Sequence, residues 1–156
     1  MIIFDIDGVL ADTKYKEKIF LRDKNIRNKR IKSKIDWTEL FKDIKYDLPI
    51  QSGILIAKAI MNYIPQTEIM FLTARPQKYM KETLKWLSEH LQVNEDDIDI
   101  TMRPNSYFKD SVLFKEQVGR EIGFNNIDFV FEDDKYICNM WRKHNVNCYH
   151  ALGGYL

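Results

Sequence analysis

Five short apolar stretches recur along the chain, and most are rich in β-branched or aromatic side chains. They are residues 1–5, 68–72, 98–102, 128–131 and 146–150. Runs of this length and composition are typical of β-strands, and their continuous apolar character indicates strands that are covered on both faces. The pattern therefore predicts five strands in the interior of the protein.

The segments between these strands have the periodicity of amphipathic helices. Apolar side chains recur at three- and four-residue spacing within residues 54–64, 79–91 and 137–141. Apolar strands that alternate with such helices indicate a parallel sheet with helices on both faces. We therefore predict an α/β fold, in which ligands bind beyond the carboxyl ends of the strands.

Polar and charged side chains gather at these predicted strand ends. The set comprises Asp5, Asp7, Thr73, Arg75, Arg103, Glu132, Asp133 and Asp134, and Lys109 and Lys115 follow the third strand. Asp5 and Asp7 would repel each other if they were buried together, unless a cation lay between them. Clustered carboxylates without thiol or imidazole ligands suit a hard cation, above all Mg²⁺, which commonly binds a substrate phosphate as well. The strand ends therefore predict a magnesium and phosphate site.

The order of these residues resembles that of a known superfamily. FDIDGVL (4–10), FLTAR (71–75), a lysine and FEDD (131–134) follow one another as in the haloacid dehalogenase-like (HAD) phosphotransferases. Receiver domains of two-component systems use similar residues, but their acidic pair precedes the phosphorylated aspartate. The resemblance implies a three-layer, Rossmann-like HAD fold with a central parallel sheet.

The resemblance also implies a role for each residue. Asp5 would be the nucleophile that forms an aspartyl-phosphate, and Asp7 the general acid and base. The ATPases of the superfamily typically have threonine in place of Asp7, so an aspartate favours a phosphatase. Thr73 and Lys115 would bind the phosphate. The metal ligands would be Asp5, Asp7, Asp133 and Asp134, whereas Glu132 is interpreted as solvated and is left out of the site.

The identity of the phosphate-binding lysine is open between two positions. NSYFKDSVLFKEQ contains both Lys109 and Lys115. Ser111 and Lys115 have helical i, i+4 spacing and would point in the same direction. We therefore favour Lys115 for catalysis and keep Lys109 as a substrate-binding candidate.

Within the superfamily, the chain is most similar to the 3′-phosphatase domain of phage-type polynucleotide kinase. TLKWLSEHL follows the second motif, TMRP comes next, and MWRKHNVNCYHALGGYL closes the chain. Arg75 stands in the place of a phosphate-contacting arginine, and Arg103 is a further substrate-binding candidate. No GxxxxGK[ST] loop occurs in the sequence, so we expect no kinase domain in this chain.

A strongly basic segment follows the first motif. Residues 14–34 contain ten Lys or Arg and two acidic residues, a net charge of +8 in a chain whose total is +1. In the superfamily, an insert at this place is a cap that selects the substrate. We expect a small, mostly helical basic cap over about residues 12–48, in which Arg27 and Arg30 contact a nucleic-acid backbone. The alternative is a solvated loop that only offsets the acidic core.

Composition adds few further limits. The chain of 156 residues predicts a single domain, residues 1–156. Cys138 and Cys148 have neither zinc-ligand spacing nor the context of a disulfide framework, so we expect reduced, buried thiols. The sequence shows no signal peptide and no membrane span, which favours a cytoplasmic protein.

Three functions compete on this basis. The first is an Mg²⁺-dependent phosphatase that removes 3′-phosphates from polynucleotide ends. The second is a phosphatase of mononucleotides, with a 5′- or 3′-nucleotide as substrate, because superfamily nucleotidases also have a helical cap after the first motif. The third is a nucleic-acid-binding module without catalysis, which predicts a broken catalytic set, whereas this set looks intact.

Overall fold

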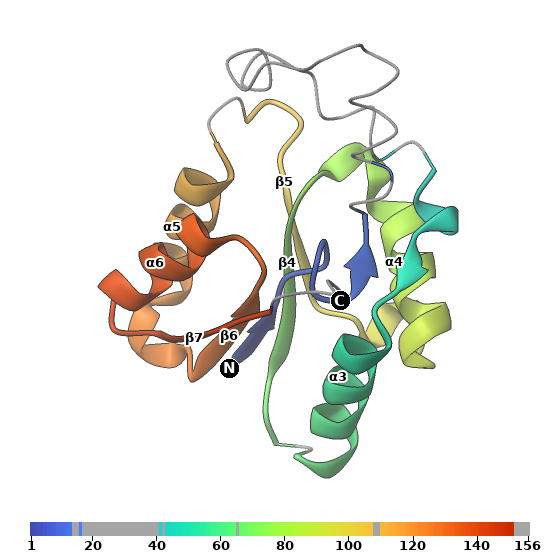
Figure 1. The fold of residues 1–156 in the computed structure, drawn as a ribbon, viewed down its shortest axis with the longest axis horizontal. Coiled ribbons are helices and arrows are strands. Elements are labelled where there is room, and N and C mark those ends of the chain that lie inside the picture. The colour runs from blue at the N-terminus through green and yellow to red at the C-terminus, as the bar shows by residue number, and fades with distance from the viewer. Residues whose placement is uncertain (14–15, 17–40, 42, 65, 108–109, 152–156) are drawn as a thin grey trace.

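A five-stranded parallel sheet forms the centre of the protein. The computed structural model describes residues 1–13, 16, 41, 43–64, 66–107 and 110–151. The strands are β1 (Ile2–Phe4), β4 (Ile69–Pro76), β5 (Ile100–Arg103), β6 (Phe129–Glu132) and β7 (Asn147–His150). They lie in the order β5-β4-β1-β6-β7, and every neighbouring pair is parallel (Figure 1). The predicted α/β fold with a central parallel sheet is therefore confirmed.

One strand differs from its predicted bounds in a way that matters for the site. The sequence predicts a strand that ends at Leu72, but β4 runs on to Pro76, and its register against β5 shifts between Thr73 and Pro76. The predicted strand was too short because TARP lacks the apolar side chains on which the pattern relies. The irregularity places Thr73 and Arg75 in the strand itself, both fully buried.

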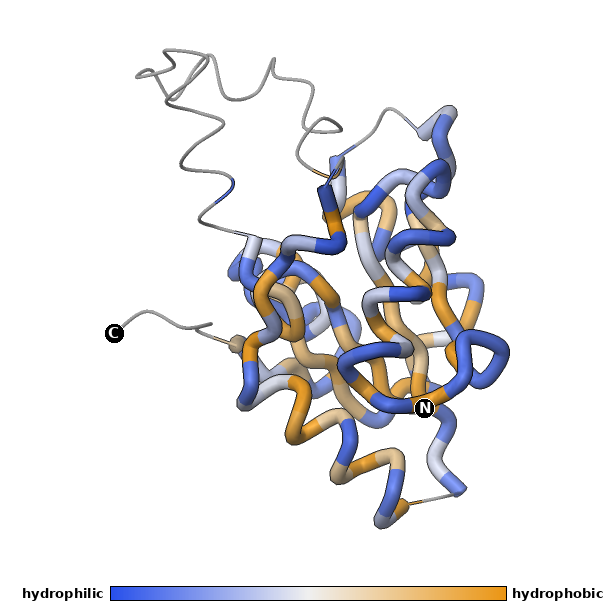
Figure 2. The backbone as a smooth tube through the Cα atoms, turned by 90° about the vertical axis from the view of Figure 1, so that its right-hand side faces the viewer, coloured by the Kyte–Doolittle hydropathy of each residue, from blue (hydrophilic) through white to orange (hydrophobic). Residues whose placement is uncertain are grey.

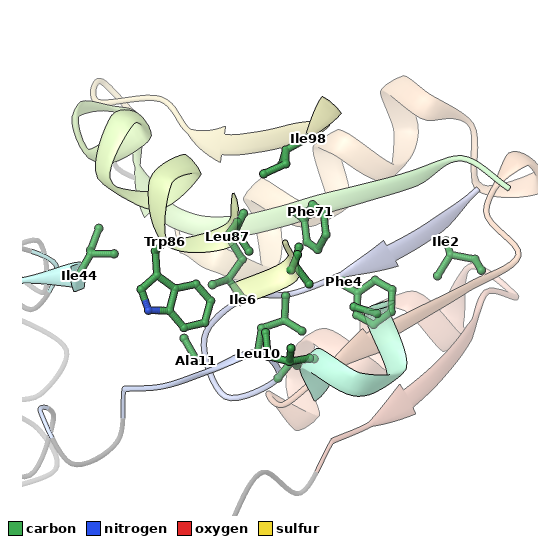
Figure 3. Packing of buried hydrophobic residues seen from close by; sticks show 14 residues of the cluster. Ile2, Phe4, Ile6, Leu10, Ala11, Ile44, Phe71, Trp86, Leu87 and Ile98 are labelled. Atoms are coloured by element: carbon green, nitrogen blue, oxygen red, sulfur yellow. The ribbon is translucent and has the colours of Figure 1, made fainter. Parts of the chain in front are cut away.

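Helices cover both faces of the sheet. On one face lie α3 (Gln51–Tyr63) and α4 (Met80–Leu91), and on the other lie α5 (Ser111–Ile122) and α6 (Lys135–Lys143) (Figure 1). Hydrophobic positions recur along the strands, and hydrophilic ones dominate many of the connecting turns (Figure 2). The first core packs Phe4 and Phe71 against Trp86 and Leu87 of α4 (Figure 3). The second surrounds Trp141 of α6.

Two features bring the start of α3 close to the loop that follows β1. The Ile50 N–H donates to the Leu10 carbonyl at 2.7 Å. A Cβ on Gly53 would lie 2.0 Å from the Val9 carbonyl oxygen, so only glycine permits this approach. The loop that contains Asp7 and Gly8 is therefore fixed against α3.

A short antiparallel pair lies outside the main sheet. It consists of β2 (Ala11–Asp12) and β3 (Leu48–Pro49), and the turns η2 (Ile44–Tyr46), η3 (Gln77–Tyr79), η4 (Glu95–Asp97) and η5 (Phe124–Asn126) complete the fold. We call the pair β2–β3 the stem. It joins the two ends of the expected cap, most of which lies outside the described residues, as do Arg27 and Arg30. The helical cap therefore stays a prediction.

The two cysteines are buried and unpaired. Cys138 lies in α6 and Cys148 in β7, and burial raises the pKa of both thiols. Both therefore stay protonated at neutral pH. Across the described part of the chain, no helix is both long and apolar enough to cross a bilayer.

Candidate active site

The carboxyl ends of β1, β4 and β6 meet around one pocket of about 210 Å³. The loop after β1 contributes Asp5 and Asp7, α5 contributes Lys115, and the end of β6 contributes Glu132 and Asp133. The remaining lining residues are Thr13, Phe41, Ala74, Ser111, Asp134 and Ile137. Five of the predicted site residues therefore line one cavity: Asp5, Asp7, Lys115, Asp133 and Asp134.

Lys115 is the buried cation between two buried carboxylates. Its Nζ lies 3.0 Å from Asp5 Oδ1 and donates to Glu132 Oε2 at 2.7 Å. Burial and the neighbouring Glu132 raise the pKa of Asp5 well above its usual range, although the Lys115 ammonium opposes this. Burial alone would lower the pKa of Lys115, but the two carboxylates outweigh it and raise that pKa. Lys115 is therefore charged at any physiological pH, and further positive charge near Asp5 would favour the ionised form of its carboxyl group.

Glu132 is a site residue that the sequence interpretation left out. Its interpretation as a solvated side chain is wrong, because the residue has no exposed surface. Besides the bond from Lys115, its Oε1 accepts hydrogen bonds from the backbone N–H groups of Asp133 and Asp134. Glu132 thus holds both the lysine and the turn that presents Asp133. The signal in the sequence was its position as the last residue of an apolar strand.

Asp7 is held by a second buried cation, Arg75. The Nε and Nη2 atoms of Arg75 donate to the Asp7 carboxylate at 2.8–3.1 Å, and the Thr73 hydroxyl donates to Asp7 Oδ2 at 3.1 Å. Burial would lower the pKa of Arg75, but Asp7 and then Asp47 outweigh it and raise that pKa. Asp7 is therefore an oriented carboxyl group at the edge of the pocket, with about a quarter of its side chain exposed.

Asp47 connects this pair to the start of the basic segment, and sequence reasoning did not single it out. Its Oδ2 accepts a hydrogen bond from Arg75 Nη2 at 3.0 Å, and its Oδ1 lies 2.5 Å from Lys16 Nζ. Burial raises the pKa of Asp47 against the pull of these two cations. Arg75 was expected to bind substrate. It lies fully buried between two carboxylates, and its Nη1 has no hydrogen-bond partner among the described residues.

Three carboxylates could hold a metal ion. One oxygen each from Asp5, Glu132 and Asp133 lies within 4.8 Å of the others. The two Glu132 oxygens already accept hydrogen bonds from Lys115 and the backbone, so Asp5 and Asp133 are the better ligands. Mg²⁺ usually binds one or two carboxylates, several waters and a phosphate, so the donor set fits this ion.

Asp134 and Gly8 stabilise the backbone around this cluster. Asp134 caps α6, because its Oδ1 accepts hydrogen bonds from the N–H groups of Tyr136 and Ile137. Gly8 adopts a positive φ of 80°, and a Cβ there would lie 2.0 Å from Asp133 Oδ2. The absence of a side chain at Gly8 therefore lets Asp133 lie directly beside the loop of Asp5 and Asp7.

Of the predicted substrate contacts, Arg75 and Arg103 are described, and neither lines this pocket. Arg103 ends β5 and is half-buried. Lys109 lies outside the described residues, as Arg27 and Arg30 do, so the structure places only Lys115 of the two lysine candidates.

Known structures share this arrangement of elements. A chain from the structure of a Pnkp1/Rnl/Hen1 complex is 18% identical and superposes with a TM-score of 0.65 over 99% of this chain and 46% of its own. A Thermotoga maritima protein assigned as a beta-phosphoglucomutase is 17% identical, with a TM-score of 0.55 over 96% of this chain and 83% of its own. The chain thus spans about half the length of the first of these proteins. A search of curated protein sequences gave no match.

The fold and the family comparison define the class of protein first. The fold is HAD-like, and the chain is a HAD-type phosphatase domain. The family model of the polynucleotide kinase PNKP phosphatase domain matches residues 1–154. The chain belongs to that family, as the sequence motifs predicted.

Proposed function

We propose that this chain is an Mg²⁺-dependent phosphatase that removes 3′-phosphates from polynucleotide ends through an aspartyl-phosphate on Asp5. The observation that carries the proposal is one pocket in which Asp5 contacts Lys115 and lies beside both Asp133 and the oriented Asp7. A nucleophile, a fixed cation and a second carboxylate are the groups that a two-step phosphoryl transfer requires.

In the first step, a carboxylate oxygen of Asp5 attacks the phosphorus atom. The bond between phosphorus and the 3′-oxygen breaks, and Asp7 gives a proton to the departing oxygen. Lys115 lies 3.0 Å from Asp5 Oδ1, so its charge is placed where negative charge gathers on the phosphoryl oxygens. Arg75 and Thr73 hold Asp7 at the pocket edge during this transfer.

In the second step, water hydrolyses the aspartyl-phosphate. Asp7, now a carboxylate, takes a proton from the water, which attacks the phosphorus atom while the bond to Asp5 breaks. Inorganic phosphate leaves, Asp5 is again a carboxylate, and Asp7 again carries the proton that it donates in the first step. A general acid and base of this kind contributes about 10²- to 10⁴-fold to the rate.

Asp5 and Asp133 are the residues that would hold Mg²⁺. The ion, when bound, supplies positive charge that favours ionised Asp5 and neutralises phosphate oxygens. Burial raises the pKa of Asp5, and a bound cation would act against this effect together with Lys115. A hard cation would therefore supply positive charge beside Asp5, in addition to that of Lys115.

Two observations support a polynucleotide substrate. The chain belongs to the PNKP phosphatase family. In addition, the basic segment 14–34 has a net charge of +8, and it follows directly after Thr13, which lines the pocket. A phosphate backbone is attracted to such a segment, and the attraction weakens as salt is added.

The substrate panel is the decisive experiment. We expect phosphate release in Mg²⁺ to be fastest with a 3′-phosphorylated oligonucleotide, compared with a 5′-phosphorylated oligonucleotide and with 3′- and 5′-mononucleotides. Equal or faster release from mononucleotides would instead make the protein a nucleotidase. No release from any of the four would contradict the phosphatase proposal.

Metal binding has a readout that is independent of turnover. Because Mg²⁺ would bind only the folded protein, we expect it to raise the free energy of unfolding by about 2.7 kcal/mol at 100 times its dissociation constant. Thermal unfolding with and without Mg²⁺ measures this shift. Asp133→Asn should remove most of it, whereas Glu89→Gln, on an exposed part of α4, should leave it intact. An equal shift in both variants would rule out Asp133 as a ligand.

A further inference from the structure

A second pocket lies on the other side of Gly8 and has a different chemical character. Its volume is about 280 Å³, and it opens between the start of α3 and the carboxyl ends of β1, β6 and β7. Its lining is Phe4, Gly8, Val9, Ile50, Ser52, Gly53, Ile56, Phe131, Tyr149, His150 and Ala151. Among the described residues, no carboxylate or lysine lines it, so its chemical character differs from that of the phosphate pocket.

Three aromatic rings form a ladder along this pocket. Phe4 stacks on Phe131 with ring centroids 4.6 Å apart, and Phe131 stacks on Tyr149 at 5.5 Å. The strand register explains the ladder, because Phe4, Phe131 and Tyr149 are direct partners across β1, β6 and β7. Phe4 lies in the core, but the last ring, Tyr149, is 56% exposed. The ladder therefore ends in an aromatic face that is open to a planar ligand.

The start of α3 adds hydrogen-bond donors to the same pocket. The first N–H groups of an α-helix have no intrahelical partners, and no side chain of the described residues caps those of α3. Ser52 and Gly53 belong to this first turn and line the pocket. An apolar, aromatic cavity with a few polar donors suits a flat heteroaromatic ring with carbonyl or ring-nitrogen acceptors.

The wall between the two pockets is thin. Gly8 borders the aromatic pocket, and a Cβ on it would touch the Asp133 carboxylate of the phosphate pocket. His150, which also borders the aromatic pocket, contacts the Asp133 carbonyl through Nε2 at 2.9 Å. A group bound in the aromatic pocket is thus a direct neighbour of a phosphate bound beside Asp5 and Asp133.

We propose that the aromatic pocket binds the nucleobase of the terminal nucleotide whose 3′-phosphate occupies the Asp5 pocket, with Tyr149 as the stacking surface. The inference rests on the proposed function for the identity of the phosphate. The pocket is slightly below the usual range of about 300–1,000 Å³ for ligand sites, which fits one base rather than a whole nucleotide. Every nucleobase can stack on an aromatic ring, so the pocket would favour an end that bears a base over an abasic end without selecting a particular base.

The test compares two 3′-phosphorylated oligonucleotides that differ only in whether the terminal residue bears a base or is abasic. We expect the native protein to have a higher kcat/KM for the base-bearing end. Tyr149→Ala should reduce this ratio by about 10-fold, mainly through KM, as expected for the loss of one base–aromatic stack. Tyr149→Phe keeps the ring and should retain the ratio. Tyr63→Ala removes an exposed tyrosine at the far end of α3 and is the matched control.

A binding measurement separates this inference from the proposed function. Thymidine or adenosine, which carry no phosphate, should shift the NMR signals of the Tyr149 ring in the native protein but not those of Tyr63. Such a shift with no release from any phosphorylated end would support the pocket and contradict the 3′-phosphatase. A base-to-abasic ratio near one in an active native protein, or a ratio unchanged by Tyr149→Ala, would overturn the proposal.

Discussion

Asp5→Asn should abolish steady-state phosphate release, with a loss of at least about 10⁴-fold, while the protein remains folded. An amide cannot form the acyl-phosphate that the two-step mechanism requires. The fold should persist because Asn can still accept the hydrogen bond that the Ile6 N–H gives to Asp5 Oδ1. Since burial raises the pKa of Asp5, the folded protein disfavours its charge, and we expect the variant to unfold at the same or a higher temperature.

Two controls accompany this substitution. Asp96→Asn makes the same chemical change at an exposed position of η4 and should leave turnover unchanged. Circular dichroism of each variant verifies the fold. Phosphate release by Asp5→Asn at a rate near that of Asp96→Asn, from a preparation free of other phosphatases, would exclude Asp5 as the nucleophile.

Lys115→Met should be the most destabilising single substitution in the site. It removes the cation between two buried carboxylates, and breaking a buried ion pair on one side costs about 3–5 kcal/mol. Asp5, whose pKa is already raised by burial and by Glu132, would lose the opposing effect of the ammonium, and its pKa in the folded state would rise further. A carboxyl group whose pKa is raised by folding stabilises the protein at low pH and loses that contribution as the pH rises through the raised value. The variant should therefore lose more stability at about pH 8 than at about pH 5.

Chemical denaturation at the two pH values measures this difference. Lys85→Met, at a position 68% exposed on α4, should change the free energy of unfolding by no more than about 0.5 kcal/mol. Combining Lys115→Met with Glu132→Gln should recover part of the stability at the higher pH, because one of the two negative charges that repel each other is then gone. If the loss of unfolding free energy in Lys115→Met is small, or is the same at both pH values, Lys115 does not offset the repulsion between the two carboxylates.

The main elements of the fold could be read from the sequence because their patterns are local. All five strands of the sheet lie where apolar runs predict them, and α3, α4 and α6 follow the predicted stripes. The stem was not predicted, since two-residue strands have no pattern of their own. The last part of β4 was missed for a similar reason. Thr73 and Arg75 are polar, and their side chains contact Asp7 in the loop after β1, so they do not extend the apolar run.

The reactive residues of the site could be predicted from the sequence, but their buried partners could not. Position at the strand ends was enough to bring Asp5, Asp7 and Asp133 to attention. Which carboxylate each cation contacts depends on three-dimensional distances that spacing does not reveal. Glu132 and Lys115 are 17 positions apart, and Arg75 and Asp47 are 28 apart. Buried partners of this kind, rather than the reactive groups, were therefore the residues that sequence reasoning left out.

The stem has a consequence for how proteins of this architecture can diversify. Ala11 pairs with Pro49 and Asp12 with Leu48, so the two ends of the segment between them lie side by side. The entropy of closing a loop grows by only about 0.6 kcal/mol for each doubling of its length. The residues between Lys16 and Phe41 can therefore lengthen, shorten or change charge in the course of evolution while the carboxylates stay in place, whereas Phe41 lines the pocket and Asp47 holds Arg75. The charge of this segment and the geometry of the carboxylates are then separable traits, because mutations in one need not disturb the other.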